Sequence, residues 1–478
     1  MLARILLFGA TTLLAACSSL PMTPTTPDVA VPVAWSTTLQ SRPIGDKSGG
    51  VALATWWDSF GDPMLGMLVR QALQANTSVM SAQAALRQAR AVRDVAAASL
   101  QPVASFSSSA QRSKTGNAGA NSFASTGIDA SWEADLFGAN RYGVRAAEAG
   151  AQAAVATLAS VQVSIAAEVA LSYIQLRGAQ ARLVIARANL ASQLETLQIT
   201  GWRVQAGLLT SLEGEQARAA SEQTEAQIPA LEANVAQIAH ALAVLCAQPP
   251  AALQSQLARV APVPQAPDEL ALSLPADTLR QRPDVAAAEY EVRAALARVS
   301  AADAARYPGF RLAGSLGLNS ASLAALGSGA VARTILAGLS GPLFDGGSRR
   351  AQVRAQQAAL EQARLAYGEA ILAALKDVED AMSALEGDRG RLLHLRYAAE
   401  AAVNADLIAR QRYTGGVVDF QVVLDTQRSL LALQDAVAST SADFSADHVR
   451  LYKALGGGWT PDRAATGGPV GTVRGKVQ

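Results

Sequence analysis

RYTGGVVDFQVVLDTQR, residues 412–428, follows the outline of an earlier stretch, RVQAGLLTSLEGEQAR, residues 203–218. In each stretch an arginine is followed four residues later by a glycine, and a second arginine closes the pattern. Other matching residues lie at nearly the same separation of roughly 210 residues, which indicates a duplicated structural unit rather than a short solenoid repeat. They include Pro102 with Pro308, Arg87 with Arg293, and Leu136-Phe137 with Leu343-Phe344. The sequence therefore predicts one architecture built twice.

Long stretches without proline predict unusually long helices. Pro229 is the only proline in residues 103–248, and residues 343–460 contain none. A proline inside a helix costs about 3 kcal/mol, so its absence permits helices that run without a break. From Val155 onward apolar residues recur at alternating steps of three and four, which is the register of a coiled coil. A helix over residues 140–202 would be roughly 90 Å long at 1.5 Å per residue.

Two pairs of short strands are predicted between these helices, at residues 103–112 with 128–137 and at residues 310–319 with 335–344. In the second strand apolar residues alternate with acidic or polar ones, which gives one apolar face. Each strand is close to the roughly 9–11 residues that cross a bilayer at a tilt. Four strands cannot close a barrel, and open edges are not tolerated in lipid, so several chains must share one barrel if the strands span a membrane. The alternative is a small soluble β-domain that caps the helices.

The N-terminus has the pattern of a bacterial lipoprotein signal. Residues 1–16 contain one positive charge and an apolar run that ends in Leu-Ala-Ala directly before Cys17, which predicts a cleaved signal peptide and lipidation of Cys17. An ordinary secretory signal with a chance cysteine is the alternative. Ser18 follows instead of an aspartate, which favours sorting to the outer membrane. Residues 17–60 are then a lipid-anchored N-terminal linker, and the acyl anchor either supplements a barrel or is the only membrane contact.

Composition and motifs exclude several function classes. A net charge of +1 with 17% charged residues leaves no basic surface for nucleic acid. The sequence lacks the GxxxxGK[ST], GxSxG and HExxH motifs, and its three histidines lie far apart, as surface or packing residues do. We therefore expect no enzyme activity, no cofactor and no metal site. Cys246 is expected to be a small core residue, and we find no apolar stretch after the signal that is long enough for a transmembrane helix.

The two arginine–glycine stretches are predicted to be tight turns between helices. Glycine permits the positive φ that ends one helix, and Thr210 or Ser211 and Asp419 are placed to cap the next. These turns resemble the periplasmic tips of the TolC/OprM/NodT family of outer-membrane efflux factors. The resemblance covers nearly the whole mature chain and also includes the entry segments Trp56-Trp57 and Leu279 to Val285 and the corner Leu343 to Gly347.

The resemblance implies a mainly α fold with a small transmembrane β part, built from a duplicated unit of helix, β-hairpin and long helix pair. We expect a first repeat at residues 61–246 with its hairpin at 103–137, an inter-repeat equatorial linker at 247–280, a second repeat at 281–458 with its hairpin at 310–344, and a flexible C-terminal tail at 459–478.

The resemblance also implies a homotrimer, in which three chains form a twelve-stranded outer-membrane barrel that continues as a periplasmic α-helical barrel. Such a duct would receive small toxic compounds from an inner-membrane pump through a periplasmic adaptor protein, as part of a tripartite efflux system. The partners would be outer-membrane lipid, the adaptor and the pump, and no nucleic acid. The alternatives are a type I protein-secretion duct of the same fold and a lipid-anchored periplasmic coiled-coil spacer without a pore.

The resemblance assigns roles to the two turns. It implies that the repeat-two turn brings Asp425 of each chain near the threefold axis, where converging carboxylates repel or bind cations or arginines. Arg428 is the candidate partner of Asp425, while Tyr413 and Arg412 would tie neighbouring helices in a closed gate. An ordinary helix-surface pair between Asp425 and Arg428 is the alternative. Gln421 stands where relatives carry an apolar sealing residue, so a hydrophobic plug is not expected. The adaptor contacts would be Gly207, Leu208, Ser211, Gly416, Val417 and Asp419.

Overall fold

The computed structural model describes residues 53–117, 119–266, 282–322 and 324–457, together with Trp35 and Trp459. The predicted signal peptide, Cys17, most of the N-terminal linker, the later part of the inter-repeat linker and the tail beyond Trp459 lie outside the described residues. The chain divides into two compact units, which we describe separately. One unit contains the strands and the helix segments that adjoin them, and the other is helical.

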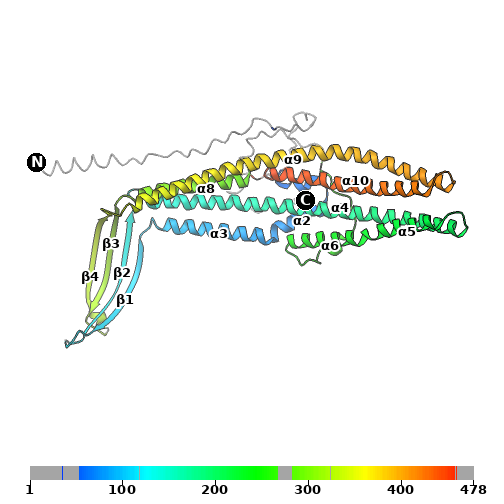
Figure 1. Cartoon of the computed structure of the whole chain (residues 1–478). Coiled ribbons are helices and arrows are strands. Elements are labelled where there is room, and N and C mark those ends of the chain that lie inside the picture. Colours follow the sequence, from blue (N-terminus) through cyan, green and yellow to red (C-terminus); the bar gives the residue numbers. More distant parts are fainter. Residues whose placement is uncertain are drawn as a thin grey trace, which may run out of the picture. The chain divides into compact units, whose positions relative to one another are not determined.

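The strand unit is built around one antiparallel sheet with the order β1-β2-β3-β4 (Figure 1). Each repeat contributes one hairpin, and pairing of β2 with β3 joins the two hairpins. The predicted strand pairs are therefore confirmed, and within one chain they form a single sheet whose edges are β1 and β4. The strands are β1 (Val103–Ser113), β2 (Asn121–Ala134), β3 (Gly309–Ser320) and β4 (Ala330–Ser340), entered from the helices α3 (Thr77–Ala98) and α8 (Pro283–Ala304).

The second strand of each hairpin begins and ends earlier than predicted. β2 starts at Asn121 rather than at residue 128, and β4 starts at Ala330 rather than at residue 335. The start of β2 is rich in Asn, Ser, Thr and Gly, which favours a turn, but β1 pairs with it from Asn121 and β3 from Ala124, and this pairing overrides that preference. At its other end Asp135 leaves the strand and accepts hydrogen bonds from the N–H groups that begin the next helix, those of Asn140 and Arg141.

The predicted long helices are confirmed. Each hairpin is followed by a helix of 67 residues, and each of these helices is followed by a helix that returns beside it (Figure 1). The return helix of repeat one breaks at Ala226, because Pro229 lacks the N–H that would continue the hydrogen-bond ladder and is tolerated only in a first helical turn. The return helix of repeat two contains no proline and runs unbroken. These helices are α4 (Ala139–Gln205), α5 (Ser211–Glu225), α6 (Gln227–Leu245), α9 (Ser348–Thr414) and α10 (Phe420–Ala454).

The core of the helical unit gathers around the N-terminal aromatic residues. The ring of Trp56, in η1 (Leu53–Phe60), stacks on Tyr452 of α10 with centroids 5.3 Å apart. Asp62 caps α2 (Pro63–Ala75) and also accepts a hydrogen bond of 2.8 Å from the hydroxyl of Tyr173 in α4. Cys246 is fully buried in this core, as predicted, and burial raises the pKa of its thiol to about 11. The short helix α7 (Gln254–Leu257) adds Leu257 to the same core.

The three histidines are surface or packing residues, as predicted. His448 is buried edge-on against Phe444, whose carbonyl oxygen lies 3.0 Å from the imidazole Nδ1, while His240 and His394 are exposed. The prediction that no apolar stretch is long enough for a transmembrane helix is wrong, because two helical segments are long and apolar enough. Segments of α4 and of residues Ser211–Leu245 reach mean hydropathies of 1.7 and 1.4, enough to cross a membrane by length and composition alone.

Candidate functional site

The register of the sheet gathers large apolar side chains on one face. Phe106 in β1 pairs with Ile128 in β2, and Ile128 pairs with Leu316 in β3, so the three residues share a face. Most of the large side chains on this face are exposed, and Ile335 in β4 is 86% exposed. The apolar residues of the face are Ala104, Phe106, Ala110, Ala124, Ile128, Ala130, Trp132, Ala134, Phe310, Leu312, Leu316, Leu318, Val331, Ile335, Ala337 and Leu339. This face is an apolar surface without a partner in the described chain.

The opposite face of the sheet is predominantly small and polar. It carries Ser, Gly, Asn and Thr together with Asp129, Glu133 and Arg311, and its exposed large apolar residues are Val103, Phe123 and Leu336. The length of the apolar stretch along a strand fits the thickness of a membrane. From Phe310 to Leu318 the backbone spans roughly 27 Å along the strand, or about 21 Å at a tilt near 40°, close to the roughly 25 Å apolar band of outer-membrane barrels.

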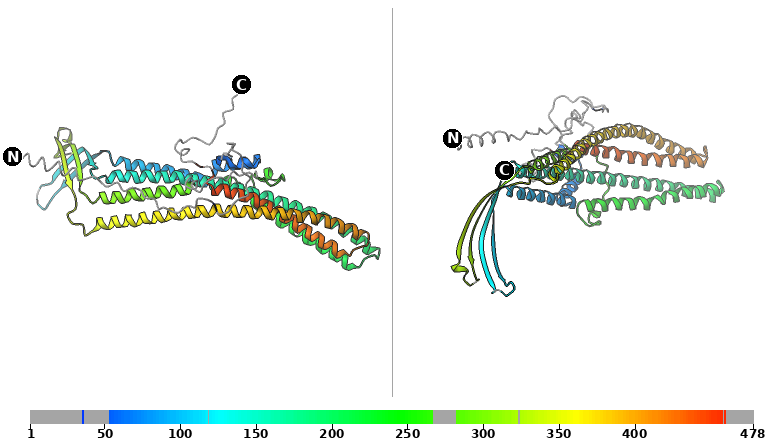
Figure 2. Two further views of the ribbon diagram at one scale, coloured as in Figure 1. Left: turned by 90° about the horizontal axis from the view of Figure 1, so that it is seen from above. Right: turned by 60° about the vertical axis from the view of Figure 1, so that its left-hand side comes forward.

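The two helix turns in the helical unit have the same backbone geometry. Gly207 and Gly416 both have φ of +72°, a value that favours glycine. In each turn the next residue donates to a carbonyl five residues back, at 2.9 Å from Leu208 to Arg203 and from Val417 to Arg412, which is a Schellman ending. Both turns lie at the same end of the helical unit (Figure 2). All the predicted adaptor contacts in these turns are exposed, and Leu208 and Val417 present equivalent apolar side chains.

The capping predictions at the two turns have different outcomes. Thr210 is the cap of α5, because its hydroxyl accepts from the N–H of Leu212 and donates to the carboxylate of Glu213. The hydrogen bond from Thr210 lowers the pKa of Glu213. Asp419 occupies the cap position of α10, but its carboxylate accepts no hydrogen bond from the helix. Its exposed carboxylate is therefore held by no cap bond in the described chain.

Tyr413 is buried at the repeat-two turn, among residues of its own chain. Its ring lies 5.4 Å from Phe420 and is covered on one side by the guanidinium of Arg203, 4.8 Å from the ring centroid. Arg203 also donates hydrogen bonds to the backbone carbonyls of Tyr413 (3.1 Å) and Thr414 (2.8 Å). The repeat-one helix α4 is thus fastened to the repeat-two turn. The tie that we predicted for Tyr413 connects helices of one chain, and it includes Arg203, a partner that sequence reasoning did not identify.

Asp425 and Arg428 both lie on the exposed face of α10. Their charged groups are 3.9 Å apart, with side chains 61% and 57% exposed, and the amide of Gln421 donates to Asp425 at 3.0 Å. Arg412 is also exposed, and its side chain makes no hydrogen bond or ion pair with the described residues. The structure therefore brings Asp425, Arg428 and Gln421 together, and leaves Arg412 free at the turn.

Sequence reasoning missed a second polar contact near the turns. The guanidinium of Arg410 in α9 forms an ion pair with the buried Asp406 and donates to the hydroxyl of Ser192 in α4 at 2.8 Å. A buried carboxylate needs such a partner, because an unpaired charge in the interior is unfavourable. The available signal was the i,i+4 spacing of aspartate and arginine, but it does not reveal that the pair is buried.

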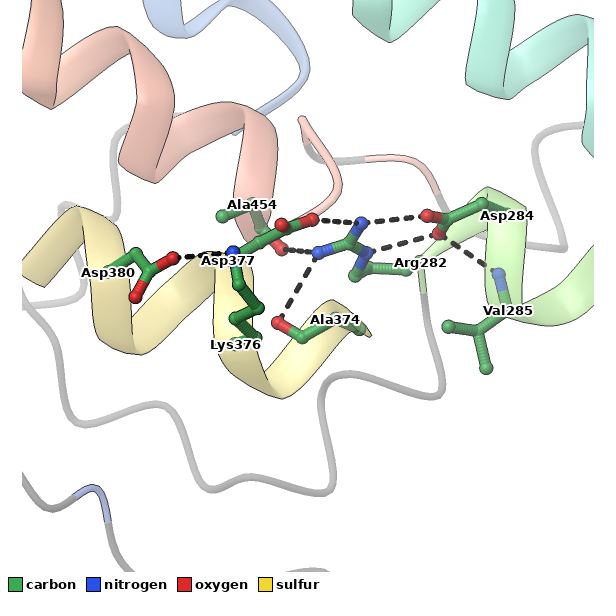
Figure 3. Close-up of polar contacts among 8 residues, drawn as sticks. All are labelled: Arg282, Asp284, Val285, Ala374, Lys376, Asp377, Asp380 and Ala454. Carbon is green, nitrogen blue, oxygen red and sulfur yellow. Dashed lines mark hydrogen bonds and ion pairs between the residues drawn. The ribbon is translucent and has the colours of Figure 1, made fainter. Parts of the chain in front are cut away.

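A third polar cluster fixes the other end of α10, around Arg282 (Figure 3). Its buried guanidinium binds Asp284 through two hydrogen bonds of 3.0 and 2.7 Å and Asp377 of α9 at 3.1 Å. It also donates to the carbonyl of Ala454, the last residue of α10, at 3.0 Å. Burial alone would raise the pKa of Asp284, but the hydrogen bond and charge of Arg282 outweigh it and hold that pKa below its usual value. Arg282 therefore connects the start of α8, the middle of α9 and the end of α10.

Comparison with known proteins agrees with this arrangement. The family model described as outer membrane efflux protein matches residues 68–248 and 274–457. The chain is 32% identical to the pyoverdine export outer membrane protein OpmQ of Pseudomonas aeruginosa, over 96% of this chain and 97% of OpmQ. It is 31% identical to nodulation protein T of Rhizobium leguminosarum bv. viciae, over 89% of each chain. The solved structure of the outer-membrane channel OprN aligns with 91% of this chain and all of its own at a TM-score of 0.82 and 34% identity. The chain belongs to the outer membrane efflux protein family, whose fold is that of channels and not of enzymes.

Proposed function

We propose that three copies of this chain form one outer-membrane duct, with a twelve-stranded barrel made of three four-stranded sheets. The observation that carries the proposal is the sheet itself, which has an apolar outer face and two unpaired edges, β1 and β4. Lipid does not tolerate free backbone groups at an edge, so β1 of one chain must pair with β4 of the next until the sheet closes. Trimers place the polar face on the lumen and the apolar face on lipid.

Two neighbouring residues of β4 test the assignment of the faces. Ile335 lies on the apolar face and Thr334 on the opposite face, and both side chains are exposed in the single chain. A lysine in contact with lipid costs about 2–4 kcal/mol near the bilayer midplane, and a trimer would contain three. Ile335→Lys should therefore abolish heat-resistant trimers on unboiled gels and conductance in planar bilayers, while Thr334→Lys should keep both. Equal tolerance of the two lysines would refute a lipid-facing apolar surface and favour a periplasmic spacer.

We propose further that the duct belongs to a tripartite efflux pump and conducts small toxic compounds that an inner-membrane pump delivers through a periplasmic adaptor. A protein-secretion duct would have the same fold. The name of the relative OpmQ, pyoverdine export outer membrane protein, describes export of a small compound and so favours the efflux assignment. Exposed Leu208 and Val417 give the two turns equivalent apolar tips for adaptor contact.

The same proposal places the gate at the repeat-two turn, with Asp425 and Arg428 as its charged residues. The duplication supplies a matched control, because Glu215 and Arg218 of α5 have the same spacing as Asp425 and Arg428 and the two acidic residues are both exposed. If Asp425 is only a helix-surface residue, Asp425→Ala and Glu215→Ala should have the same effect on single-channel conductance. If Asp425 closes the pore, only Asp425→Ala should raise single-channel conductance and weaken cation selectivity, because three ties are lost in one ring. Identical conductance in both variants would remove Asp425 from the gate.

We propose, finally, that Cys17 is lipidated. The acyl chains would anchor the mature N-terminus in the outer membrane and supplement the barrel, which remains the main membrane contact.

A further inference from the structure

The apolar face of the sheet carries two charged side chains among its strand residues, and both are arginines. Arg112 pairs with Ser122, which places it on the same face as Phe106 and Ile128. Arg333 pairs with Leu316, which places it on that face as well. Both side chains are exposed, and neither makes a hydrogen bond or an ion pair with the described residues. Two unpaired guanidiniums therefore interrupt a face that is otherwise apolar, small or hydroxylated.

Both arginines lie near the loops that join the strands, away from the helices. Arg112 is the second residue from the end of β1, and Arg333 is the fourth residue of β4. A charged side chain on the lipid face is most unfavourable at the bilayer midplane and is tolerated near the interface, so these positions suit the headgroup level. Arginine also extends its charge toward the interface along an apolar stem.

The charge around these two positions is entirely positive. Residues 112–128 contain Arg112 and Lys114 but no aspartate or glutamate, and residues 312–344 contain Arg333 and no acidic residue. The acidic residues of the sheet, Asp129 and Glu133, belong to the opposite face and to the helix-proximal half of β2. No carboxylate of the hairpins is therefore placed to neutralise the arginines, and an anion from outside the chain is needed.

We propose that Arg112 and Arg333 bind the phosphate groups of an anionic lipid in the outer leaflet of the membrane. Planar guanidiniums bind phosphate oxygens in bidentate geometry, and clustered basic residues at a membrane surface recognise phosphorylated headgroups. The inference rests on the proposed function, because β1 of one chain must meet β4 of the next. Each of the three seams between chains then carries Arg112 from one chain and Arg333 from its neighbour, so a lipid bound there also bridges two subunits.

The test uses the full trimer in phosphatidylcholine nanodiscs, titrated with diphosphoryl lipid A, with retained lipid measured by native mass spectrometry. The wild-type trimer should retain this lipid in preference to phosphatidylcholine. The double variant with Arg112→Gln and Arg333→Gln should need roughly tenfold more lipid for the same occupancy. Arg311→Gln on the opposite face is the matched control and should bind as the wild type does. The double variant with Arg112→Lys and Arg333→Lys, which keeps the charge, should lie between.

Conductance recorded on the same preparations tests the trimeric duct separately from the lipid site. A conducting wild-type trimer without preference for the phosphorylated lipid, or equal occupancy in the double glutamine variant, overturns the lipid site and leaves the duct intact. Equal loss in Arg311→Gln also overturns it, because the effect would then not belong to the apolar face. Competition by inorganic pyrophosphate as effective as lipid A would show a free-phosphate site and refute the lipid assignment. Absence of trimers and conductance in the wild type would refute the duct and this inference together.

Discussion

Replacing Arg282 with methionine should loosen the end of α10, because the guanidinium donates a hydrogen bond to the carbonyl of its last residue, Ala454. The last carbonyls of a helix have no partner within the helix, and Arg282 donates to the carbonyl of the buried Ala454. Methionine keeps much of the volume of the side-chain stem but makes none of these hydrogen bonds. The contact with Ala374 is long, at 3.5 Å, and lies within α9, so its loss matters less.

The magnitude follows from how exposed each partner is. Asp284 and Asp377 have side chains that are 42% and 48% exposed, so water replaces much of what they lose, and each contributes about 0.5–1 kcal/mol. The carbonyl of Ala454 is left buried without this donor, which costs about 1 kcal/mol or slightly more. Together these give about 2–3 kcal/mol. Amide hydrogen exchange near residues 451–457 should then be roughly 30- to 150-fold faster than in the wild type.

A control variant on the surface of α8 and the pH dependence of exchange both test this prediction. Arg298 pairs with Glu291 at 3.9 Å on the exposed surface of α8, so Arg298→Met should change exchange by less than about threefold. Because the folded pKa of Asp284 is lowered, its contribution is present above the usual carboxyl pKa and is lost as the pH falls through the folded value. The wild type should therefore lose this protection in acid, and Arg282→Met should not show the loss. Unchanged exchange at the end of α10 in Arg282→Met would refute the reasoning.

Three further predictions concern other parts of the chain. A Cβ at Gly178 of α4 would lie 2.8 Å from that of Ala442, whereas at Gly387 of α9 it would meet nothing within 4 Å. Gly178→Ala should therefore destabilise the protein by about 1–3 kcal/mol and Gly387→Ala stabilise it by about 0.5–1 kcal/mol in denaturant unfolding, and equal signs would contradict the packing argument. Gly207→Val and Gly416→Val, at φ of +72°, should abolish efflux in cells with normal trimer abundance, and unchanged efflux in both would remove the turns from adaptor docking. Cys17→Ala, behind a signal peptide that does not require lipidation, should lose acyl labelling but keep trimers in the outer membrane, and a soluble periplasmic product would contradict a barrel anchor.

The helices and the apolar sheet face were predictable because each has a strong period in the sequence. Proline-free stretches and apolar steps of three and four led to helices within a few residues of α4, and alternation in the second strand placed Ile128 and Trp132 on one face. The start of β2 was not predictable in this way. Asn121 and the small residues after it have the composition of a turn, and they form a strand because β1 pairs with them from Asn121 and β3 from Ala124.

The site was only partly predictable for a related reason. The pair of Asp425 and Arg428 is visible because its members lie one helical turn apart. Arg203 bonds backbone carbonyls of Tyr413 and Thr414, and a carbonyl acceptor leaves no mark on residue type. Contacts between side chains and distant backbone therefore escape sequence patterns, even where both turns are recognised.

The duplication gives the two turns the same backbone but different side-chain contacts. Gly207 and Gly416 have the same φ, and the two endings share the same hydrogen bonds, so the turns differ only in their side chains. Arg203 and Arg412 occupy equivalent positions in the two repeats. The Arg203 side chain donates hydrogen bonds to the repeat-two turn, whereas the Arg412 side chain makes no hydrogen bond with the described residues. In the proposed ring of three chains, symmetry does not relate the repeat-one turns to the repeat-two turns, so the two kinds of turn are free to lie at different distances from the axis. The anchored side chain of Arg203 in repeat one and the unanchored side chain of Arg412 in repeat two are a difference of the kind that the proposed gate at the repeat-two turn predicts.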